Sequence, residues 1–415
     1  MISLLVRVFT CAAIADFLIN AHAADTIKIA FIAGLSGPFA YQGEEALKVF
    51  YAAAELHNSE SKDAARTKFE IIPFDSKSNP QEALIVLKRA IDQDIRFVAS
   101  TTSSTAHAIT AAVAKHNARN PGRTVLFLNY NALDPALTEA KCNFWHFRFE
   151  VHSDTQVDVL TDVMAKQRSI QKVYLINQDY AYGQAVSRAS REMLEKKRPD
   201  IQIVGDELIP LNKIKDFAPY VAKIRATGAG TVLTGNAGSD LSLLIKASKE
   251  ADLQVTYYTL LGALFGTPAA IGAEGAERIK TLASWHLNAA GPVWEQRLIQ
   301  YASKYKSKSD FAYLPPFRIL DMLASAMSKA GTQDPLRVAQ ALEGATYKGP
   351  SGDSWMRAED HQLIAPVYVM SFVKAGQGPV KHDAEGTGYG WRTDTLIPAQ
   401  SIIPGIRCKM ERPAP

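Results

Sequence analysis

Residues 26–57 read TIKIAFIAGLSGPFAYQGEEALKVFYAAAELH, and this stretch decides the fold. Residues 27–33 form an apolar run that only Lys28 interrupts, which is short enough for a buried strand. Gly34, Gly37 and Pro38 predict a loop at the carboxyl end of that strand, where doubly wound sheets bind their ligands. From Glu44 onward the apolar residues recur at helical spacing, so a helix follows. A strand, a Gly/Pro loop and a helix in this order form half of a ligand site.

The same order of elements recurs along the chain. Apolar strands are expected at residues 69–74, 97–99, 125–128, 173–176, 201–208 and 231–233, and helical patterns lie between them. Repeated pairs of a strand and a helix predict parallel sheets that helices cover on both faces. A second set of such pairs begins near Phe147, so the sequence predicts an α/β fold with two Rossmann-like lobes.

Composition and motifs narrow the function. The chain has 415 residues, of which 47% are hydrophobic, and its formal net charge is only +4. No long basic run is present, so we do not expect a nucleic-acid partner. The sequence contains no GxSxG elbow, HExxH motif or P-loop. We therefore predict no catalytic residue, no metal site and no cofactor, and we expect a protein that is not an enzyme.

The first 23 residues resemble an export signal. Arg7 precedes an apolar stretch, and residues 21–23 (Ala-His-Ala) have the small-x-small form of a cleavage site. We therefore expect an exported chain that is cleaved near Ala23. Loss of Cys11 would leave Cys142 and Cys408, which an oxidising compartment would join in a disulfide. Two buried thiols are the alternative.

The run IKIAFIAGLSGPFAYQGEEAL (residues 27–47) and the later loops, taken in order, resemble the periplasmic solute-binding proteins of the leucine/isoleucine/valine type, which serve ABC importers. The resemblance implies a type I periplasmic-binding fold, in which two Rossmann-like lobes with parallel sheets are joined by a three-segment hinge. The crossings are expected near Arg148, Ser284 and Gly349. The division that follows is a signal peptide at 1–23, a first lobe at 24–148 and 285–348, a second lobe at 149–284 and 349–380, and a tail at 381–415 that is tied back to the hinge or the first lobe.

The resemblance places a ligand between the two lobes. In the first lobe it assigns Tyr41 and Gln42 of the opening run to the site, together with Ser103 and Ser104 of the hydroxyl-rich loop that follows the strand at 97–99. That loop opens a helix expected from Ala106, and its hydroxyl and N–H groups would hold a carboxylate. The alternative is that Ser104 or Thr105 only caps the helix.

Five further positions complete the polar part of the predicted site. Asn129, Tyr130 and Asn131 occupy the next loop of the first lobe, although Tyr130 could instead pack under that loop. In the second lobe Tyr182 aligns with a family tyrosine that closes over the ligand, unless it packs on the following helix. Asn236 stands where the family has another tyrosine.

Leu261 is the most informative departure from the family pattern. Amino-acid-binding members have a glutamate at this position that holds the ammonium group of the ligand, and neither Asp179 nor Asp240 is at the matching position. Burying an ammonium group without a partner in a closed cleft costs on the order of several kcal/mol of binding free energy. The ligand is therefore expected to keep a carboxylate and lack the α-amino group. Aromatic residues such as Phe39 and Phe265 favour an aromatic acid, although both could be packing residues. Arg318 is left open between a ligand contact and a solvent-exposed side chain.

These observations predict a monomeric periplasmic binding protein that captures a small organic acid. Its implied partners are the ligand, an inner-membrane ABC permease and the ATPase subunits of that permease. The alternatives are a branched-chain amino-acid binding protein and a ligand-sensing subunit for a chemoreceptor or sensor kinase.

Overall fold

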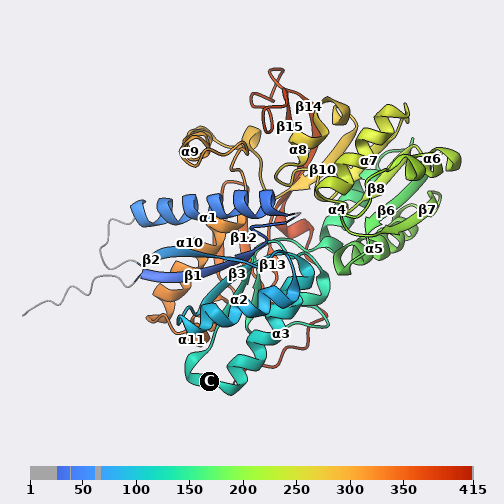
Figure 1. The fold of residues 1–415 in the computed structure, drawn as a ribbon. Helices are drawn as coiled ribbons and strands as arrows, with labels where there is room; N and C mark the ends of the chain where they lie inside the picture. The colour runs from blue at the N-terminus through green and yellow to red at the C-terminus, as the bar shows by residue number, and fades with distance from the viewer. Residues whose placement is uncertain (1–25, 38, 61–66, 414–415) are drawn as a thin grey trace, which may run out of the picture.

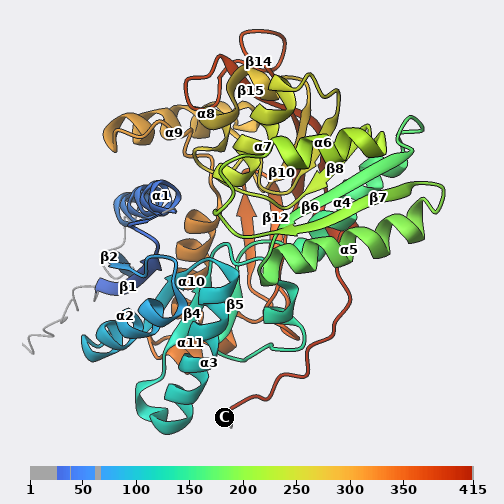
Figure 2. The ribbon, with the colours of Figure 1, turned by 45° about the vertical axis from the view of Figure 1, so that its right-hand side comes forward.

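The structure is a computed structural model that describes residues 26–37, 39–60 and 67–413 (Figures 1 and 2). The expected signal segment, with Cys11 and the cleavage site near Ala23, lies outside these residues. Within them, no helix combines the length and the apolar character needed to cross a membrane.

The amino-terminal part of the chain builds a five-stranded parallel sheet in the order β2-β1-β3-β4-β5. Its strands are β1 (Thr26–Ala33), β2 (Lys68–Asp75), β3 (Phe97–Ser100), β4 (Leu126–Asn129) and β5 (His146–Arg148). The connecting helices are α1 (Ala40–Glu60), α2 (Pro80–Asp92), α3 (Ser103–Arg119), η1 (Pro121–Arg123) and η2 (Pro135–Thr138). Asn79 caps α2 as its sequence indicates, because its side chain accepts from the N–H groups of Gln81 and Glu82.

A seven-stranded sheet has the order β15-β14-β10-β9-β8-β6-β7. Its parallel strands are β6 (Lys172–Gln178), β7 (Gln202–Ile209), β8 (Thr231–Thr234), β9 (Thr256–Thr259) and β10 (Ile279–Ala283). At one edge β14 (Val367–Lys374) and β15 (Tyr389–Ile397) run antiparallel. The helices of this part are α4 (Ser153–Ala165), α5 (Ala181–Lys197), α6 (Ala218–Thr227), α7 (Ser239–Glu250), α8 (Thr267–Ile271) and η3 (Gly272–Gly275).

The remaining elements return to the first sheet and join the two parts. Helix α10 (Pro315–Ala330) packs against α1 and α11 (Pro335–Leu342). A small antiparallel sheet contains β11 (Thr346–Gly349), β12 (Gly352–Met356) and β13 (Leu363–Ile364). The other segments are η4 (Leu287–Ala289), α9 (Pro292–Lys304) and η5 (Ala399–Ser401).

The two large sheets form the two lobes of a type I periplasmic-binding fold. The chain leaves the first sheet after β5, leaves the second after β10, and enters the second again between β13 and β14. Near the third passage, the N–H group of Arg148 donates to the carbonyl of His361 at 2.9 Å, so the segment before β13 contacts β5. The lobe boundaries given by the sequence stay a prediction.

The opening stretch folds as expected, except that α1 begins at Ala40 instead of Glu44. Gly34 and Gly43 lie so close together that a Cβ atom on Gly43 would overlap the carbonyl oxygen of Gly34. This contact allows the first turn of the helix to lie directly against the end of β1. The first turn does not face the core, so the apolar periodicity begins only after it.

The carboxyl-terminal tail connects the two parts of the molecule. It leaves β15 of the seven-stranded sheet and reaches Cys408, which is bonded to Cys142 between η2 and β5 (Figure 2, dark red). The predicted disulfide is therefore confirmed, and the alternative of two free thiols is wrong. Arg412 also bonds to Glu343 and to the carbonyl of Ala358.

Candidate functional site

A cavity lies where the carboxyl ends of the strands in both large sheets meet. We call it the ligand chamber; it encloses about 780 Å³ of space outside the protein atoms, its opening included. Six of the sequence-predicted residues line it, namely Gln42, Ser103, Tyr130, Asn131, Tyr182 and Leu261. Tyr41, Ser104, Asn129 and Asn236 are described by the structure but do not line it. Whether the lining residues contact a ligand stays a prediction.

The amino terminus of α3 provides donors for an anion. The first main-chain bond of this helix runs from the N–H group of Ala106 to the carbonyl of Thr102 at 2.9 Å, so the preceding amides have no acceptor within the helix. Thr102 and Ser103 line the chamber, and Thr102 has a φ of 66°, which is rare for a β-branched residue. Free amides and the helix dipole together favour a carboxylate or a similar anion at this position.

The structure corrects the predicted start and cap of this helix. It begins at Ser103, not Ala106, and its cap residue is Thr102, which makes no side-chain capping bond. The reading in which Ser104 or Thr105 caps α3 is therefore wrong. The hydroxyl of Ser103 accepts the N–H group of Asp134 at 3.2 Å, which ties the helix start to the next loop.

In the loop after β4, some polar residues hold the loop in place and others line the chamber. Asn129 is buried, and its side chain bonds to the N–H and carbonyl groups of Ala132 at 2.6 and 3.0 Å, so it holds the loop. Arg148 supports the same loop through the carbonyls of Ala132 and Asp134 at 3.0 and 2.7 Å. Tyr130 stacks on Phe31 with ring centroids 5.5 Å apart and also lines the chamber. Both sequence readings of Tyr130 therefore describe part of its environment.

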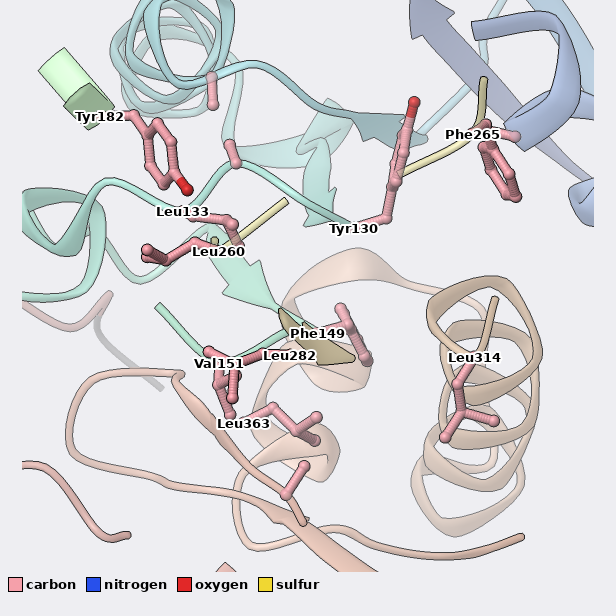
Figure 3. Packing of buried hydrophobic residues seen from close by; sticks show 14 of the residues in the cluster. Tyr130, Leu133, Phe149, Val151, Tyr182, Leu260, Phe265, Leu282, Leu314 and Leu363 are labelled. Atoms are coloured by element: carbon pink, nitrogen blue, oxygen red, sulfur yellow. The ribbon is translucent and has the colours of Figure 1, made fainter. Parts of the chain in front are cut away.

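The opposite wall comes from the seven-stranded sheet. Tyr180 and Tyr182 line the chamber from the start of α5, and their ring centroids are 5.7 Å apart. Figure 3 shows the ring of Tyr182 among Leu133 and Leu260. The hydroxyl of Tyr182 is buried without a hydrogen-bond partner, so it is available to a ligand. Asn236 is fully buried beside this wall, and both polar atoms of its side chain are also unpartnered.

Tyr41 lies at the contact between the two parts of the molecule instead of inside the chamber. A Cβ atom on Gly266 would lie 2.8 Å from Cδ1 of Tyr41, and Gly266 has a φ of 82°. Only glycine fits both conditions, so the loop before α8 can approach α1 closely. Glu385 holds that loop, because its carboxylate accepts the N–H groups of Gly266 and Ala269 at 2.7 and 2.9 Å.

The charge of the ligand chamber is decisive for its chemistry. Among the described residues that line it, none is Asp, Glu, Lys, Arg or His. Leu261 does line it, whereas Asp179 and Asp240 do not. The carboxylate of Asp240 already accepts from Gln178 at 2.7 Å and from the N–H group of Asn212 at 2.8 Å. The chamber therefore offers N–H and hydroxyl groups to a carboxylate and no counter-charge to an α-ammonium group.

Several lining residues were not found from the sequence. Ser78, Tyr180 and Tyr313 line the chamber, and Tyr313 comes from the segment before α10. Ser78 follows β2, so its position after a strand was an available signal. No nearby sequence signal identifies Tyr313, because only the return of the chain to the first sheet brings this residue to the cavity. Arg318 is fully buried, donates to the carbonyl of Phe149 at 2.9 Å and does not line the chamber, so both sequence readings of it are wrong.

Comparison with known proteins gives a consistent result. The sequence profile of the periplasmic binding protein family matches residues 26–377. The chain is 31% identical to Leu/Ile/Val-binding protein homolog 4 of Brucella abortus, over 97% of each chain. The closed conformation of a leucine-, isoleucine-, valine-, threonine- and alanine-binding protein from Brucella ovis is 29% identical and has a TM-score of 0.82, over 94% of this chain and 100% of that one. A solute-binding protein of R. palustris in complex with 4-hydroxybenzoate shares the fold at 18% identity, with a TM-score of 0.76 over 90% of this chain and 97% of that one.

Proposed function

Because the chain belongs to the periplasmic binding protein family, whose members are transport proteins that serve ABC importers, we propose that it captures a small carboxylate without an α-amino group. The carboxylate lies at the amino terminus of α3, between Ser103 of one lobe and Tyr182 of the other. The ligand is then delivered to an inner-membrane ABC permease. The observation that carries the proposal is the absence of any charged side chain among the described residues that line the ligand chamber, with Leu261 at the position of the expected glutamate.

The shape and composition of the chamber favour an apolar or aromatic body on this carboxylate. Phe39, Tyr130, Tyr180 and Phe265 contribute aromatic faces to its wall. The R. palustris protein in complex with 4-hydroxybenzoate has the same fold, so an aromatic acid is compatible with this architecture.

The same geometry supports capture of the ligand between two lobes. Residues of both large sheets line the chamber, so neither sheet alone surrounds the ligand. A ligand that touches both lobes binds the closed form more tightly than the open form, and this difference drives closure.

A branched-chain amino acid is the second candidate, because the relatives from both Brucella species carry names that include leucine, isoleucine and valine. A thermal-shift screen of monocarboxylates, amino acids, amides and sugars separates the two. A ligand at about 100 times its dissociation constant stabilises the folded state by about 2.7 kcal/mol. The proposal expects the largest shifts from monocarboxylates, and shifts confined to α-amino acids would support the second candidate instead.

A further inference from the structure

A second cavity borders the ligand chamber. We call it the hinge chamber; it encloses about 750 Å³ outside the protein atoms, its opening included. Asn131, Leu261, Leu264, Phe265 and Tyr313 line both cavities, so they form a shared wall. The rings of Phe265 and Tyr313 lie edge to face in this wall, with centroids 5.1 Å apart.

The hinge chamber lies where all three passages between the large sheets meet. Glu150 and Val151 follow β5, residues 284–286 follow β10, and Val367 begins β14, and all of them line this chamber. A group bound here therefore contacts each segment that must change when the lobes move.

Unlike the ligand chamber, the hinge chamber is lined by acidic side chains. Glu150 and Asp310 line it, and no Lys or Arg is among the described residues that do so. The Glu150 carboxylate accepts the N–H group of Val151 at 2.9 Å, and the Asp310 carboxylate accepts that of Ala312 at 3.1 Å. Burial raises the pKa of both carboxyl groups, and for Glu150 the charge of Arg318 opposes this rise. The basic residues whose charge acts on these carboxyl groups, Arg318 on Glu150 and His382 on Asp310, do not line the cavity.

Unpartnered atoms on other lining residues also indicate a polar occupant. Gln156 and His286 are more than nine-tenths buried, and Oε1 of Gln156 and Nδ1 of His286 have no hydrogen-bond partner. Burial lowers the pKa of His286 to about 4, so its ring is neutral near pH 7 and adds no positive charge. The unpartnered Oε1 of Gln156 is an acceptor and the unpartnered indole N–H of Trp285 is a donor, whereas the role of Nδ1 of His286 depends on the ring tautomer. The carboxylate oxygens of Glu150 and Asp310 add further acceptors to the chamber.

We propose that the hinge chamber binds a primary ammonium group at the far end of a ligand whose carboxylate occupies the ligand chamber. This inference rests on the proposed function and names its substrate class, an ω-amino carboxylate. Leu261 lines both chambers, so the apolar spacer of such a ligand passes the position at which the family resemblance implies a glutamate for an α-ammonium group. Val151, Leu260 and Leu282 give the hinge chamber apolar surface for that spacer (Figure 3).

A structural role for Glu150 is the main competing explanation. Arg318 donates to the carbonyl of Phe149, the residue before Glu150, and could serve only to neutralise that carboxylate. However, no ion pair within 4.0 Å joins them in the described part of the chain, and Asp310 has no basic partner at that distance either. One buried and one partly buried carboxylate, neither with a direct basic partner, favour a bound cation over a closed structural pair.

Calorimetry with matched acids tests the inference. The probes are 4-aminobutanoate, 6-aminohexanoate and 4-(aminomethyl)benzoate, each paired with butanoate, hexanoate or 4-methylbenzoate, which lack the amino group. In at least one pair the ω-amino acid should bind at least about tenfold more tightly than its partner. The variant Glu150→Gln should remove that advantage and leave the affinity for the unsubstituted acid within about threefold, and Asp310→Asn provides a second, independent variant.

The outcomes separate this inference from the proposed function. If the unsubstituted acids bind and the ω-amino group adds nothing in any pair, the ammonium site is overturned and the carboxylate site stands. The same holds if both variants keep the full advantage, or if both weaken the two members of each pair equally, because the carboxylates then act structurally. If no member of any pair binds while α-amino acids do, both proposals are overturned.

Discussion

At the scale of single residues, Leu261 is the residue that selects the ligand in our proposal. Its side chain lines both chambers, and no carboxylate among the described residues that line the ligand chamber replaces the glutamate that the family resemblance places here. The neighbouring acids Asp179 and Asp240 bond to their own surroundings instead, through Gln184 and Gln178. We therefore expect selectivity against α-amino acids to depend on this one position.

Replacing Leu261 by glutamate should create a partner for an α-ammonium group. We expect the variant Leu261→Glu to bind leucine at least about tenfold more tightly than the parent, which is about 1.4 kcal/mol. The variant Leu261→Gln has the same length without the charge and should not show this gain. Calorimetry of both variants measures the difference, and equal leucine affinities would mean that residue 261 does not face the ammonium group.

His286 should make stability depend on pH. Its pKa is lowered by burial to about 4, whereas histidine in an unfolded chain titrates near 6.5. Between these values the unfolded chain binds a proton that the folded chain does not, so the free energy of unfolding falls as the pH decreases from about 6.5 to about 4 and is level above that range. The loss attributable to His286 is on the order of 3 kcal/mol.

Thermal unfolding of the parent and of His286→Gln between pH 7.5 and 4.5 measures this contribution. The variant should lose less stability than the parent over this range, whereas His116→Asn, at a partly exposed site near the end of α3, serves as the control. An identical decline for the parent and His286→Gln would contradict the assignment.

At the scale of elements, the amino terminus of α3 is the part of the site that binds the carboxylate in our account. Ser103 lines the chamber and Ser104 does not, although the two are adjacent. Ser103→Ala should therefore weaken the binding of a monocarboxylate by about 1–3 kcal/mol, because a hydrogen bond to a charged group is lost. Ser104→Ala is the matched control and should bind as the parent does. Calorimetry with 4-methylpentanoate distinguishes them, and equal effects of the two changes would argue against a specific role of Ser103.

Most regular elements follow from the sequence, because alternating apolar strands and helical patterns report burial directly. The starts of α1 and α3 could not be predicted from the sequence, because their first turns face the cavity and lack the apolar spacing of a core-facing helix. The antiparallel strands β14 and β15 were also not predicted, because their pairing depends on a return of the chain after more than one passage between the sheets.

The site was predictable to the level of loops but not of side chains. Asn129 and Asn131 occupy the same loop, yet Asn129 bonds within it and Asn131 lines the cavity. The two asparagines are two residues apart in an irregular segment, and nothing in the sequence distinguishes the orientations of their side chains. Tyr313 shows the other limit, because it reaches the chamber only through the long-range packing of α10.

At the scale of the whole molecule, the tail is a covalent link between the two sheets in addition to the three passages of the main chain. It runs from β15 to Cys408, and the bond to Cys142 spans a sequence separation of 266 residues. An ion pair between Arg407 and Glu139 at 3.6 Å lies beside the disulfide. The link restricts the unfolded chain, so it should stabilise the fold.

Removing this link should destabilise the protein. On the chain-entropy model a loop of this length contributes up to about 5 kcal/mol, so the double variant Cys142→Ser and Cys408→Ser should unfold at clearly lower denaturant concentration than the parent. Arg407→Gln removes only the adjacent ion pair, which is partly exposed, and should change the midpoint little. An unchanged midpoint in the double variant would show that the tail adds nothing to global stability.

The most direct test of the account is a calorimetric comparison of leucine with 4-methylpentanoate on the protein without substitutions. The two molecules share the same carbon skeleton and carboxylate, and only leucine carries an α-amino group. In the described part of the chain, no carboxylate lines the ligand chamber to pair with that group. The account predicts that 4-methylpentanoate binds at least about tenfold more tightly than leucine. Leucine binding with a dissociation constant below about 1 μM, together with weaker binding of 4-methylpentanoate, would contradict it.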